Sequence, residues 1–308
     1  MQIVREIENY IPDNKPLYLA LGNFDGLHQG HQNLIKKMVK MAYNNGTAAA
    51  FVFEPHPIKV LFPERAPKLL VTPERKAKLF EKFGVNLLIY NSFNESIAKC
   101  PPAEFIKTLC WKLRVKHIFV GFNYTFGHKA AGTPELLQEL GEEYGFQVSI
   151  IPQVKVCGVP VSSSLIRQAL SDGNIKLARA MLGYNPILDG QVVEGEQRGR
   201  TIGFPTANIS ISGEMLVPGK GVYAAKCKVR EKVYNAVVNI GSKPTFHEEY
   251  RTVIEAHLID FESDIYGENI SLYFLEKIRD ERKFSGTDEL VKQIIKDKGK
   301  AQEIVVNH

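Results

Sequence analysis

Short apolar runs alternate with helix-like stretches through the first half of the chain, and this alternation leaves few possible folds. The apolar runs, each long enough for one buried strand, are residues 17–22, 47–55, 85–90, 117–122 and 147–152. The helix-like stretches are residues 31–43, 73–83, 102–113 and 133–144. Apolar strands that alternate with helices are typical of a parallel sheet covered on both faces. We therefore predict an α/β fold with a doubly wound parallel sheet for this half.

Closely spaced strands without intervening helices characterise the second half. Residues 221–229 alternate strictly, with Lys226 and Lys228 on one face and apolar side chains on the other. Three further strands are expected at residues 233–241, 252–261 and 270–278. This spacing predicts a small antiparallel β-barrel or β-sandwich.

A single helix is expected to close the chain. Its predicted apolar stripe consists of Leu290, Val291, Ile294 and Ile295. Ser285 and Asp288 are placed to cap its first turn. Glycine and proline interrupt the strand and helix pattern around residues 181–190, so we predict two domains, residues 1–184 and residues 185–308.

Composition excludes several classes of protein. Lys and Arg number 39 against 34 Asp and Glu, and the net charge of +5 suits anionic small ligands but is too diffuse for nucleic acid. The four cysteines lie far apart without zinc-site spacing, which indicates reduced thiols and a cytoplasmic location. The longest apolar run, residues 48–53, is strand-sized, so neither secretion nor membrane insertion is expected.

Residues 22–31, GNFDGLHQGH, connect the first predicted strand to the first predicted helix. Ligands of doubly wound sheets bind at the carboxyl ends of the strands, and a helix N-terminus attracts phosphate. His28 and His31 face the same way if the helix has begun. Two surface histidines on a tight turn are the alternative, but three glycines with Asn23 and Asp25 favour a site for polyphosphate.

This stretch resembles the nucleotidylyltransferase signature G-x-F-D-G-x-H-x-G-H of prokaryotic bifunctional riboflavin kinase/FAD synthetases. The motif alone leaves other adenylyltransferases open. Class I aminoacyl-tRNA synthetases share H-x-G-H, but the lysine-rich KMSKS-type loop that they need is missing here. The resemblance implies a Rossmann-like nucleotidylyltransferase domain with His28 and His31 as catalytic residues. It also implies that ATP is bound by Gly22, Asn23, Phe24, Asp25 and Gly30.

Residues 161–167, VSSSLIR, are similar to the second nucleotide motif of the family, I-S-S-T-x-x-R. Ser162, Ser163 and Ser164 offer hydroxyl groups at a helix start, and Arg167 follows Ser164 by about one turn, or roughly 5 Å of rise. An ordinary serine cap with a solvated arginine is the alternative. The resemblance implies that all four residues bind ATP, with Ser164 where the family usually has Thr.

Residues 199–209, GRTIGFPTANI, resemble the riboflavin kinase motif around P-T-A-N. By this resemblance Thr206 and Asn208 coordinate Mg²⁺ and the ATP phosphates, which suits a hard cation that prefers oxygen ligands. Gly199 and Gly203 would let the loop close over phosphate.

Glu255 matches the catalytic glutamate of the kinase family. Alternation places it on one strand face with His257, and a solvent-facing strand residue without a role is the alternative. The resemblance further implies that Asn123, in residues 121–132, helps to hold flavin or nucleotide and that Arg279 contacts the flavin. For Asn123, a turn-forming residue after a strand is the alternative.

The resemblance covers nearly the whole chain and implies a bifunctional transferase. ATP would phosphorylate riboflavin to FMN in the C-terminal β-barrel domain, and the N-terminal domain would adenylylate FMN to FAD. Mg²⁺ is the implied cofactor, and riboflavin, FMN and ATP are the expected partners of a monomer or weak homo-oligomer. A chain with one working activity and a flavin-binding regulator on the same fold are the alternatives.

Overall fold

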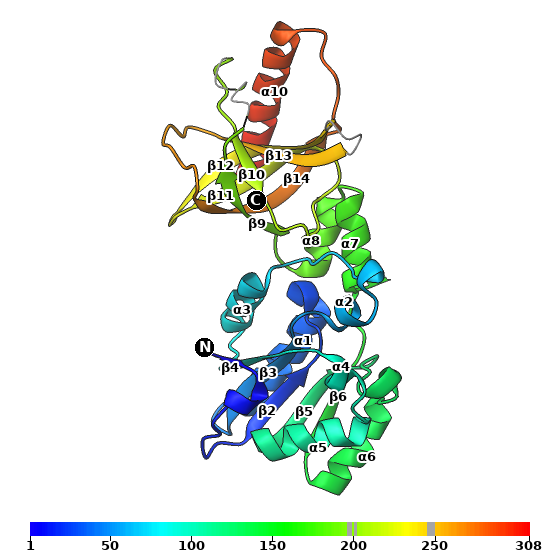
Figure 1. Ribbon diagram of the computed structural model, residues 1–308. Coiled ribbons are helices and arrows are strands. Elements are labelled where there is room, and N and C mark those ends of the chain that lie inside the picture. The colour runs from blue at the N-terminus through cyan, green and yellow to red at the C-terminus, as the bar shows by residue number, and fades with distance from the viewer. Residues whose placement is uncertain (196–198, 200–201, 245–249) are drawn as a thin grey trace. The chain divides into compact units, whose positions relative to one another are not determined.

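The computed structural model describes residues 1–195, 199, 202–244 and 250–308 (Figure 1). The chain forms two compact units. The first comprises residues 1–68 and 73–162, and the second comprises residues 69–72 and 163–308.

A six-stranded parallel sheet forms the first unit, with the strand order β1-β4-β3-β2-β5-β6. Its strands are β1 (Gln2–Arg5), β2 (Leu17–Leu21), β3 (Thr47–Phe53), β4 (Leu87–Asn91), β5 (Val115–Gly121) and β6 (Gln147–Ile151), followed by the short pair β7 (Lys155–Val156) and β8 (Val159–Pro160). The α-helices are α1 (Gln29–Ala42), α2 (Pro57–Leu61), α3 (Pro73–Lys82), α4 (Glu95–Ala98), α5 (Pro102–Leu113) and α6 (Pro134–Tyr144). The doubly wound prediction is confirmed.

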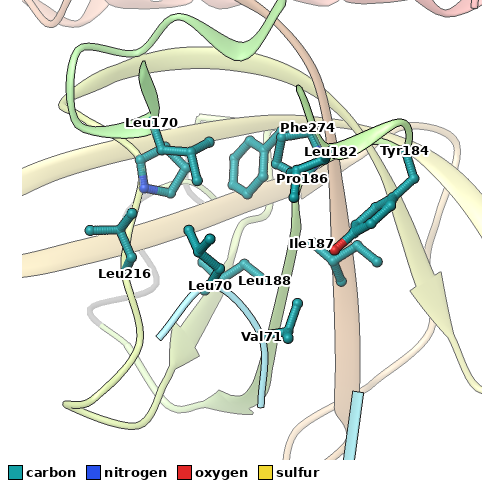
Figure 2. A pocket seen from close by; sticks show the side chains of 11 residues that line it. Leu70, Val71, Leu170, Leu182, Tyr184, Pro186, Ile187, Leu188, Leu216 and Phe274 are labelled. Carbon is teal, nitrogen blue, oxygen red and sulfur yellow. The ribbon is translucent and has the colours of Figure 1, made fainter. Parts of the chain in front are cut away.

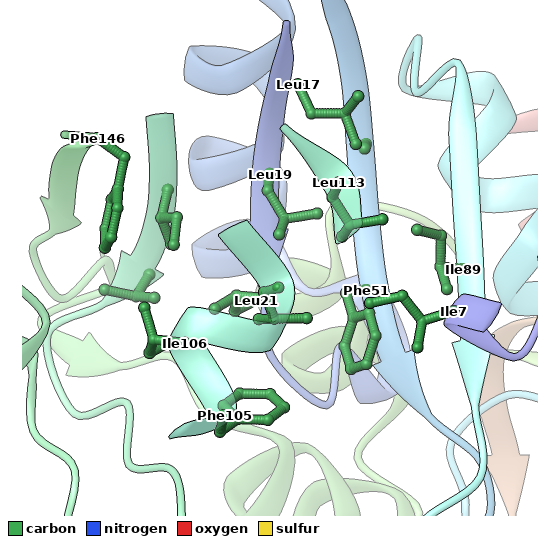
Figure 3. Close-up of a cluster of buried hydrophobic side chains, with 14 of the residues drawn as sticks. Ile7, Leu17, Leu19, Leu21, Phe51, Ile89, Phe105, Ile106, Leu113 and Phe146 are labelled. Atoms are coloured by element: carbon green, nitrogen blue, oxygen red, sulfur yellow. The ribbon is translucent and has the colours of Figure 1, made fainter. Parts of the chain in front are cut away.

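The central strand β2 shows how helices cover both faces of this sheet. Its alternate residues Leu17, Leu19 and Leu21 share one hydrophobic cluster with Phe105 and Ile106 of α5 (Figure 3). The intervening residues of β2 face the opposite side, because successive strand residues alternate, and α1 packs against β2 as well. All five residues of β2 are buried, as the continuous apolar run predicted.

A closed antiparallel barrel forms most of the second unit, with the strand order β10-β13-β12-β11-β14-β9. Its strands are β9 (Ile187–Val193), β10 (Ala207–Ser210), β11 (Gly221–Val229), β12 (Lys232–Pro244), β13 (Tyr250–Leu258) and β14 (Asn269–Arg279). In the described part of this unit, the helices include α7 (Ser163–Ser171), α8 (Ile175–Leu182) and α10 (Thr287–Val306). The structure therefore selects the barrel over the sandwich.

Five strands in the described part of the chain were not predicted from the sequence, namely β1, β7, β8, β9 and β10. β1 is a four-residue edge strand with one buried residue, so its pattern is weak. β9 contains Asp189 and Gly190, which interrupt its apolar pattern. Asp189 accepts a hydrogen bond of 2.6 Å from the Ser271 hydroxyl of β14, and a Cβ on Gly190 would lie 2.7 Å from the Ser210 carbonyl of β10. Both residues serve strand pairing rather than the core.

The predicted apolar stripe of the last helix is partly wrong. Ile295 is 56% exposed, whereas Ala301 is fully buried against Val222 and Leu275 on the outside of the barrel. The buried face of α10 also includes a charged residue, Asp297. A search for apolar residues alone therefore assigns the buried face of this helix to the wrong residues.

The prediction that Asp288 helps to cap this helix is also wrong. α10 begins after Gly286, and Glu289, not Asp288, accepts hydrogen bonds from the backbone N–H and the hydroxyl of Ser285. The longer glutamate side chain reaches back across the first turn, as in a capping box shifted by one residue.

α7 and α8 belong to the same compact unit as the barrel. They contribute to an apolar cluster around a cavity of only about 10 Å³, so the side chains fill the space almost completely (Figure 2). The lining residues are Leu70, Val71, Leu170, Leu182, Tyr184, Pro186, Ile187, Leu188, Leu216, Pro218 and Phe274. In the described part of the chain, no helix is both long enough and apolar enough to cross a bilayer.

A fragment of residues 163–308 is expected to be more stable than a fragment of residues 185–308. The shorter fragment loses Leu170 and Leu182, which are nearly fully buried, and two such side chains contribute about 3–6 kcal/mol. Urea unfolding of both fragments, followed by circular dichroism, measures the difference. Equal free energies of unfolding would mean that α7 and α8 do not stabilise the barrel.

Candidate functional sites

The GNFDGLHQGH stretch connects the carboxyl end of β2 to α1, as predicted. β2 lies between β3 and β5 in the middle of the sheet. The carboxyl ends of these parallel strands lie at one edge, so the loop that follows β5 and contains Asn123 starts beside this stretch. Asn123 itself is exposed, and its role in flavin binding stays a prediction.

The backbone of this connection is strained and is held by a buried ring. Phe24 has φ 48° and ψ 35°, a left-handed conformation that non-glycine residues rarely adopt. Its ring is 1% exposed and packs edge-on against Phe80 of α3 and His31, at centroid distances of 5.3 and 5.2 Å. A Cβ on Gly22 would lie 3.2 Å from the same ring, so Gly22 permits this close packing.

The two histidines lie face to face, as their spacing predicted. Their rings stack at 3.7 Å with 12° between the planes, although His28 is the N-cap residue of α1 and only His31 lies inside the helix. His28 Nδ1 accepts a hydrogen bond of 3.3 Å from the His31 backbone N–H. A Cβ on Gly30 would come within 3.2 Å of the His28 ring, so Gly30 makes room for the stack.

Burial keeps both imidazoles neutral. It lowers the pKa of His28 to about 4. The pKa of His31 is also lowered, first by burial and then by the neighbouring His28 and Lys76. Since His28 Nδ1 accepts a hydrogen bond, its proton resides on Nε2, which is a donor. Among the described residues, the buried Nδ1 of His31 has no hydrogen-bond partner.

Two charged residues lie beside the histidines. Asp25 is 3% exposed, and the ammonium group of Lys76 donates a hydrogen bond of 3.0 Å to the Asn23 carbonyl oxygen. Sequence reasoning proposed Asp25 but missed Lys76, which lies on α3. The sequence held one indication of this: Lys76 precedes Phe80 by four residues, so the two side chains share one face of α3, and Phe80 is buried.

The serine-rich motif starts a helix, as predicted, since α7 begins at Ser163. Ser162 ends the first unit, whereas Ser163, Ser164 and Arg167 belong to the second. The prediction that these four residues bind ATP stays a prediction.

The second group of predicted residues meets on neighbouring strands of the barrel. Asn208 of β10 and Asn239 of β12 are the direct cross-strand partners of Glu255 on β13. Directly opposed residues have Cβ atoms about 4.5–5.5 Å apart on the same face. Ile254 and Ala256 are buried while Glu255 is half-buried, so the predicted alternation is confirmed. Asn239 is a polar neighbour that sequence reasoning missed, because only the register reveals it.

Thr206 is fixed just before β10. His257 Nδ1 lies 2.9 Å from the Pro205 carbonyl oxygen, and its ring packs edge-on against Phe204 at 5.6 Å. A Cβ on Gly199 would lie 2.3 Å from the Phe204 carbonyl oxygen and 3.3 Å from the Thr206 hydroxyl, so only glycine fits there.

The loop before β10 has two further glycines of note. Gly203 has φ +82°, in the left-handed region that favours glycine, and the space beside it is open. A Cβ on Gly195 would lie 1.9 Å from the side-chain nitrogen of Asn208, so Gly195 makes room for this amide. Residues 196–198 and 200–201 of the loop lie outside the described part of the chain.

A cavity of about 310 Å³ opens next to Thr206. Its walls are mostly apolar, with carboxylates at Glu262 and Asp264. The lining residues are Val192, Pro205, Thr206, Ala207, Ala256, Leu258, Phe261, Glu262, Ser263, Asp264, Ile265 and Tyr266. An apolar cavity with a few polar groups is the usual form of a small-molecule site.

Arg279 makes contacts that hold α10 to the barrel. Its Nε and Nη2 atoms bind the carboxylate of Asp297, with the shortest distance at 2.8 Å, and its Nη1 donates to the Asp280 carbonyl oxygen. Val222 of β11 is the cross-strand partner of both Arg279 on β14 and Asn239 on β12. Arg279 is therefore one strand beyond Asn239, the direct neighbour of Glu255. Its contact with flavin stays a prediction.

The donor groups around Glu255 fit a magnesium ion. Thr206 and Asn208 offer neutral oxygens and Glu255 a carboxylate, and Mg²⁺ commonly takes its remaining ligands from water and phosphate. A cluster of three or more His, Cys, Asp or Glu side chains that could hold a metal on its own is not found in residues 1–195, 199, 202–244 and 250–308.

Two family models match the two halves of the chain. Residues 10–165 match the family model of FAD synthetase, and residues 182–305 match that of riboflavin kinase. Most of α7 and most of α8 lie between the two matches, and both helices belong to the unit of the barrel. The predicted functional boundary at residue 184 stays a prediction.

Relatives match over nearly the whole chain. The "Bifunctional riboflavin kinase/FMN adenylyltransferase" of Bacillus subtilis (strain 168) is 41% identical over 288 residues, which are 92% of this chain and 90% of that protein. The protein of the same name from Escherichia coli (strain K12) is 36% identical over 307 residues, 98% and 97% of the two chains. A crystal structure described as a macrolide-efflux protein from Streptococcus pneumoniae is 32% identical with a TM-score of 0.89, and covers 97% of this chain and 98% of that one.

His28 is expected to titrate near pH 4 in the folded protein, against 6.5 for an exposed histidine. Between these values the unfolded chain binds more protons at this residue, so its contribution to stability falls as the pH is lowered through that window. Imidazole ¹H–¹⁵N NMR spectra recorded from about pH 3 to 8 measure the titration, and a His28→Gln variant assigns the signal. A midpoint near 6.5 would contradict the neutral site.

Proposed function

Because the chain belongs to the bifunctional riboflavin kinase/FMN adenylyltransferase family, we propose that it carries out both reactions that convert riboflavin to FAD. In the first, the ribityl 5′-hydroxyl of riboflavin takes the γ-phosphoryl group of ATP, and ADP leaves. In the second, an FMN phosphate oxygen attacks the α-phosphorus of another ATP, and pyrophosphate leaves. The observation that carries the proposal is the register that sets Asn208 of the P-T-A-N motif directly beside Glu255.

Glu255 is the proposed general base of the kinase reaction. Its carboxylate accepts the hydroxyl proton as the oxygen bonds to the γ-phosphorus, and the bond from the γ-phosphorus to the β,γ-bridging oxygen breaks. Asn208 and Asn239 flank Glu255 on the neighbouring strands. These amides are positioned to hold the carboxylate and the substrate in line, and such alignment supplies much of phosphoryl-transfer catalysis.

Thr206 and Asn208 are the proposed residues that hold Mg²⁺ with the ATP phosphates, together with Gly199 and Gly203 as phosphate-binding loop residues. Bound magnesium supplies positive charge to phosphate oxygens. Gly199 lets the loop backbone approach the Thr206 hydroxyl to within van der Waals distance, which supports a tight phosphate loop here.

The 310 Å³ cavity is the proposed site of the adenosine part of this ATP. Thr206 lies on its wall, so phosphates bound at Thr206 would lead into it. Its walls include the aromatic rings of Phe261 and Tyr266, which suit a flat base. Riboflavin then approaches from the outer strand face that carries Glu255, and Arg279 is the proposed flavin contact farther along that face.

Adenylyl transfer is proposed to occur at the carboxyl end of β2. The phosphate of FMN is already anionic, so no protein base is needed. His28 donates from Nε2 as a neutral imidazole, His31 lies stacked beside it, and the backbone N–H groups at the start of α1 attract phosphate. Gly22, Asn23, Phe24, Asp25 and Gly30 shape this site. We propose that Ser162, Ser163, Ser164 and Arg167 bind ATP, and that Asn123 contacts FMN.

We further propose that the protein works in the cytoplasm as a monomer or weak homo-oligomer, and that it binds neither nucleic acid nor membranes. The four free cysteines and the diffuse net charge of +5 support this assignment.

Incubation with riboflavin, ATP and Mg²⁺, followed by chromatography of the products, tests the proposed function. Both FMN and FAD are expected, and the absence of both would overturn the proposal.

Replacing Glu255 with Gln should lower riboflavin phosphorylation by roughly 10² to 10⁴ while FMN adenylylation stays nearly unchanged. Glutamine preserves the size and one acceptor oxygen but takes up no proton. Purified variant is assayed with riboflavin in one reaction and FMN in another. Kinase activity within a few-fold of wild type would show that Glu255 is not the base.

Replacing both His28 and His31 with Ala should stop FAD formation while FMN accumulates. The variant loses the hydrogen-bond donors that face the polyphosphate, but the barrel is untouched. Time courses from riboflavin and ATP follow both products. If the double variant converts FMN to FAD at the wild-type rate, the histidines do not belong to the adenylyl-transfer site.

A further inference from the structure

α3 packs onto two successive residues of the GNFDGLHQGH stretch. The Phe80 ring contacts the Phe24 ring at 5.3 Å, and one turn earlier Lys76 donates a hydrogen bond of 3.0 Å to the Asn23 carbonyl oxygen. Residues four apart share a helix face, so one face of α3 makes both contacts. Lys76 is thereby held beside the residues proposed to bind ATP.

The ammonium group of Lys76 lies in a mixed electrostatic environment. Burial lowers its pKa, while the carboxylates of Asp25 and Glu54 act in the opposite direction and favour the charged form. Its charge also contributes to the low pKa of His31, which places the two groups close to each other. An ammonium group has three N–H donors, and the Asn23 carbonyl oxygen takes one of them.

ATP brings several negative charges to a site whose histidines are neutral. A helix N-terminus contributes only about half an elementary charge, so hydrogen bonds alone leave most of the phosphate charge unbalanced. During adenylyl transfer the bond from the α-phosphorus to the bridging oxygen breaks, and its electron pair leaves with pyrophosphate. A cation fixed near that oxygen stabilises the charge that develops on it.

We propose that Lys76 is a catalytic residue of adenylyl transfer, whose ammonium group binds the polyphosphate of ATP beside His31 and stabilises the charge that passes to pyrophosphate. This inference rests on the proposed function. The competing interpretation is that Lys76 only fixes the backbone at Asn23.

Two substitutions separate these roles. Lys76→Gln retains a donor for the Asn23 carbonyl oxygen but has no charge, whereas Lys76→Arg retains the charge. Lys76→Gln is expected to lower kcat/KM for ATP in FMN adenylylation by roughly 10² to 10³, the usual effect of losing one group that stabilises developing charge. Lys76→Arg should keep more of the activity than Lys76→Gln. In the reverse reaction, Lys76→Gln should raise the KM for pyrophosphate more than the KM for FAD.

The matched control is Lys78→Gln, an exposed lysine on the same helix, which should leave both activities unchanged. Circular dichroism and thermal unfolding report whether the first unit of each variant is folded, and riboflavin phosphorylation, which is assigned to the second unit, should stay within about twofold of wild type. Lys76→Gln with wild-type adenylylation would overturn the inference, as would equal losses in the Gln and Arg variants. If wild-type protein makes no FAD from FMN, the proposed function fails instead.

Discussion

Burial of β2 on both faces is the constraint on which the first unit depends. Every side chain of this strand is at most 5% exposed, so the chain can leave the sheet only at the end of the strand and must turn at once into a covering helix. Phe24 lies in that turn and anchors it, because its side chain is buried. Its ring is part of the core although its backbone is left-handed, and the packing of Phe80 and His31 around the ring keeps the strained conformation in place.

Barrel closure sets a comparable constraint in the second unit. In a closed sheet, a shift of one residue moves every side chain to the opposite face. The burial of Ile254, Ala256 and Leu258 in the interior therefore determines that Glu255 and His257 face outward. The buried apolar residues of β13 thus determine which way Glu255, the proposed base of the kinase reaction, points.

The sequence allowed prediction of what is local, namely long apolar strands, the helix starts after Thr133 and at Ser163, and the alternation around Glu255. It did not reveal Lys76, whose partner Asn23 is 53 residues away, or Asn239, which joins Glu255 only through the register. Both depend on tertiary pairing. The stripe of α10 failed for a related reason, since the helix buries Asp297 against Arg279 instead of a continuous apolar face.

The two proposed sites use the same nucleotide but need opposite properties from the protein. Phosphorylation of a neutral hydroxyl requires a group that takes up a proton, and the proposed group, Glu255, lies half-buried on the outer barrel face. Attack by an already anionic phosphate requires no base, so a proton-accepting carboxylate is not needed there. There the protein presents neutral imidazoles and a lysine, and the buried Asp25 lies near that lysine. The two reactions therefore call for different side chains, and the chain carries each set on its own fold.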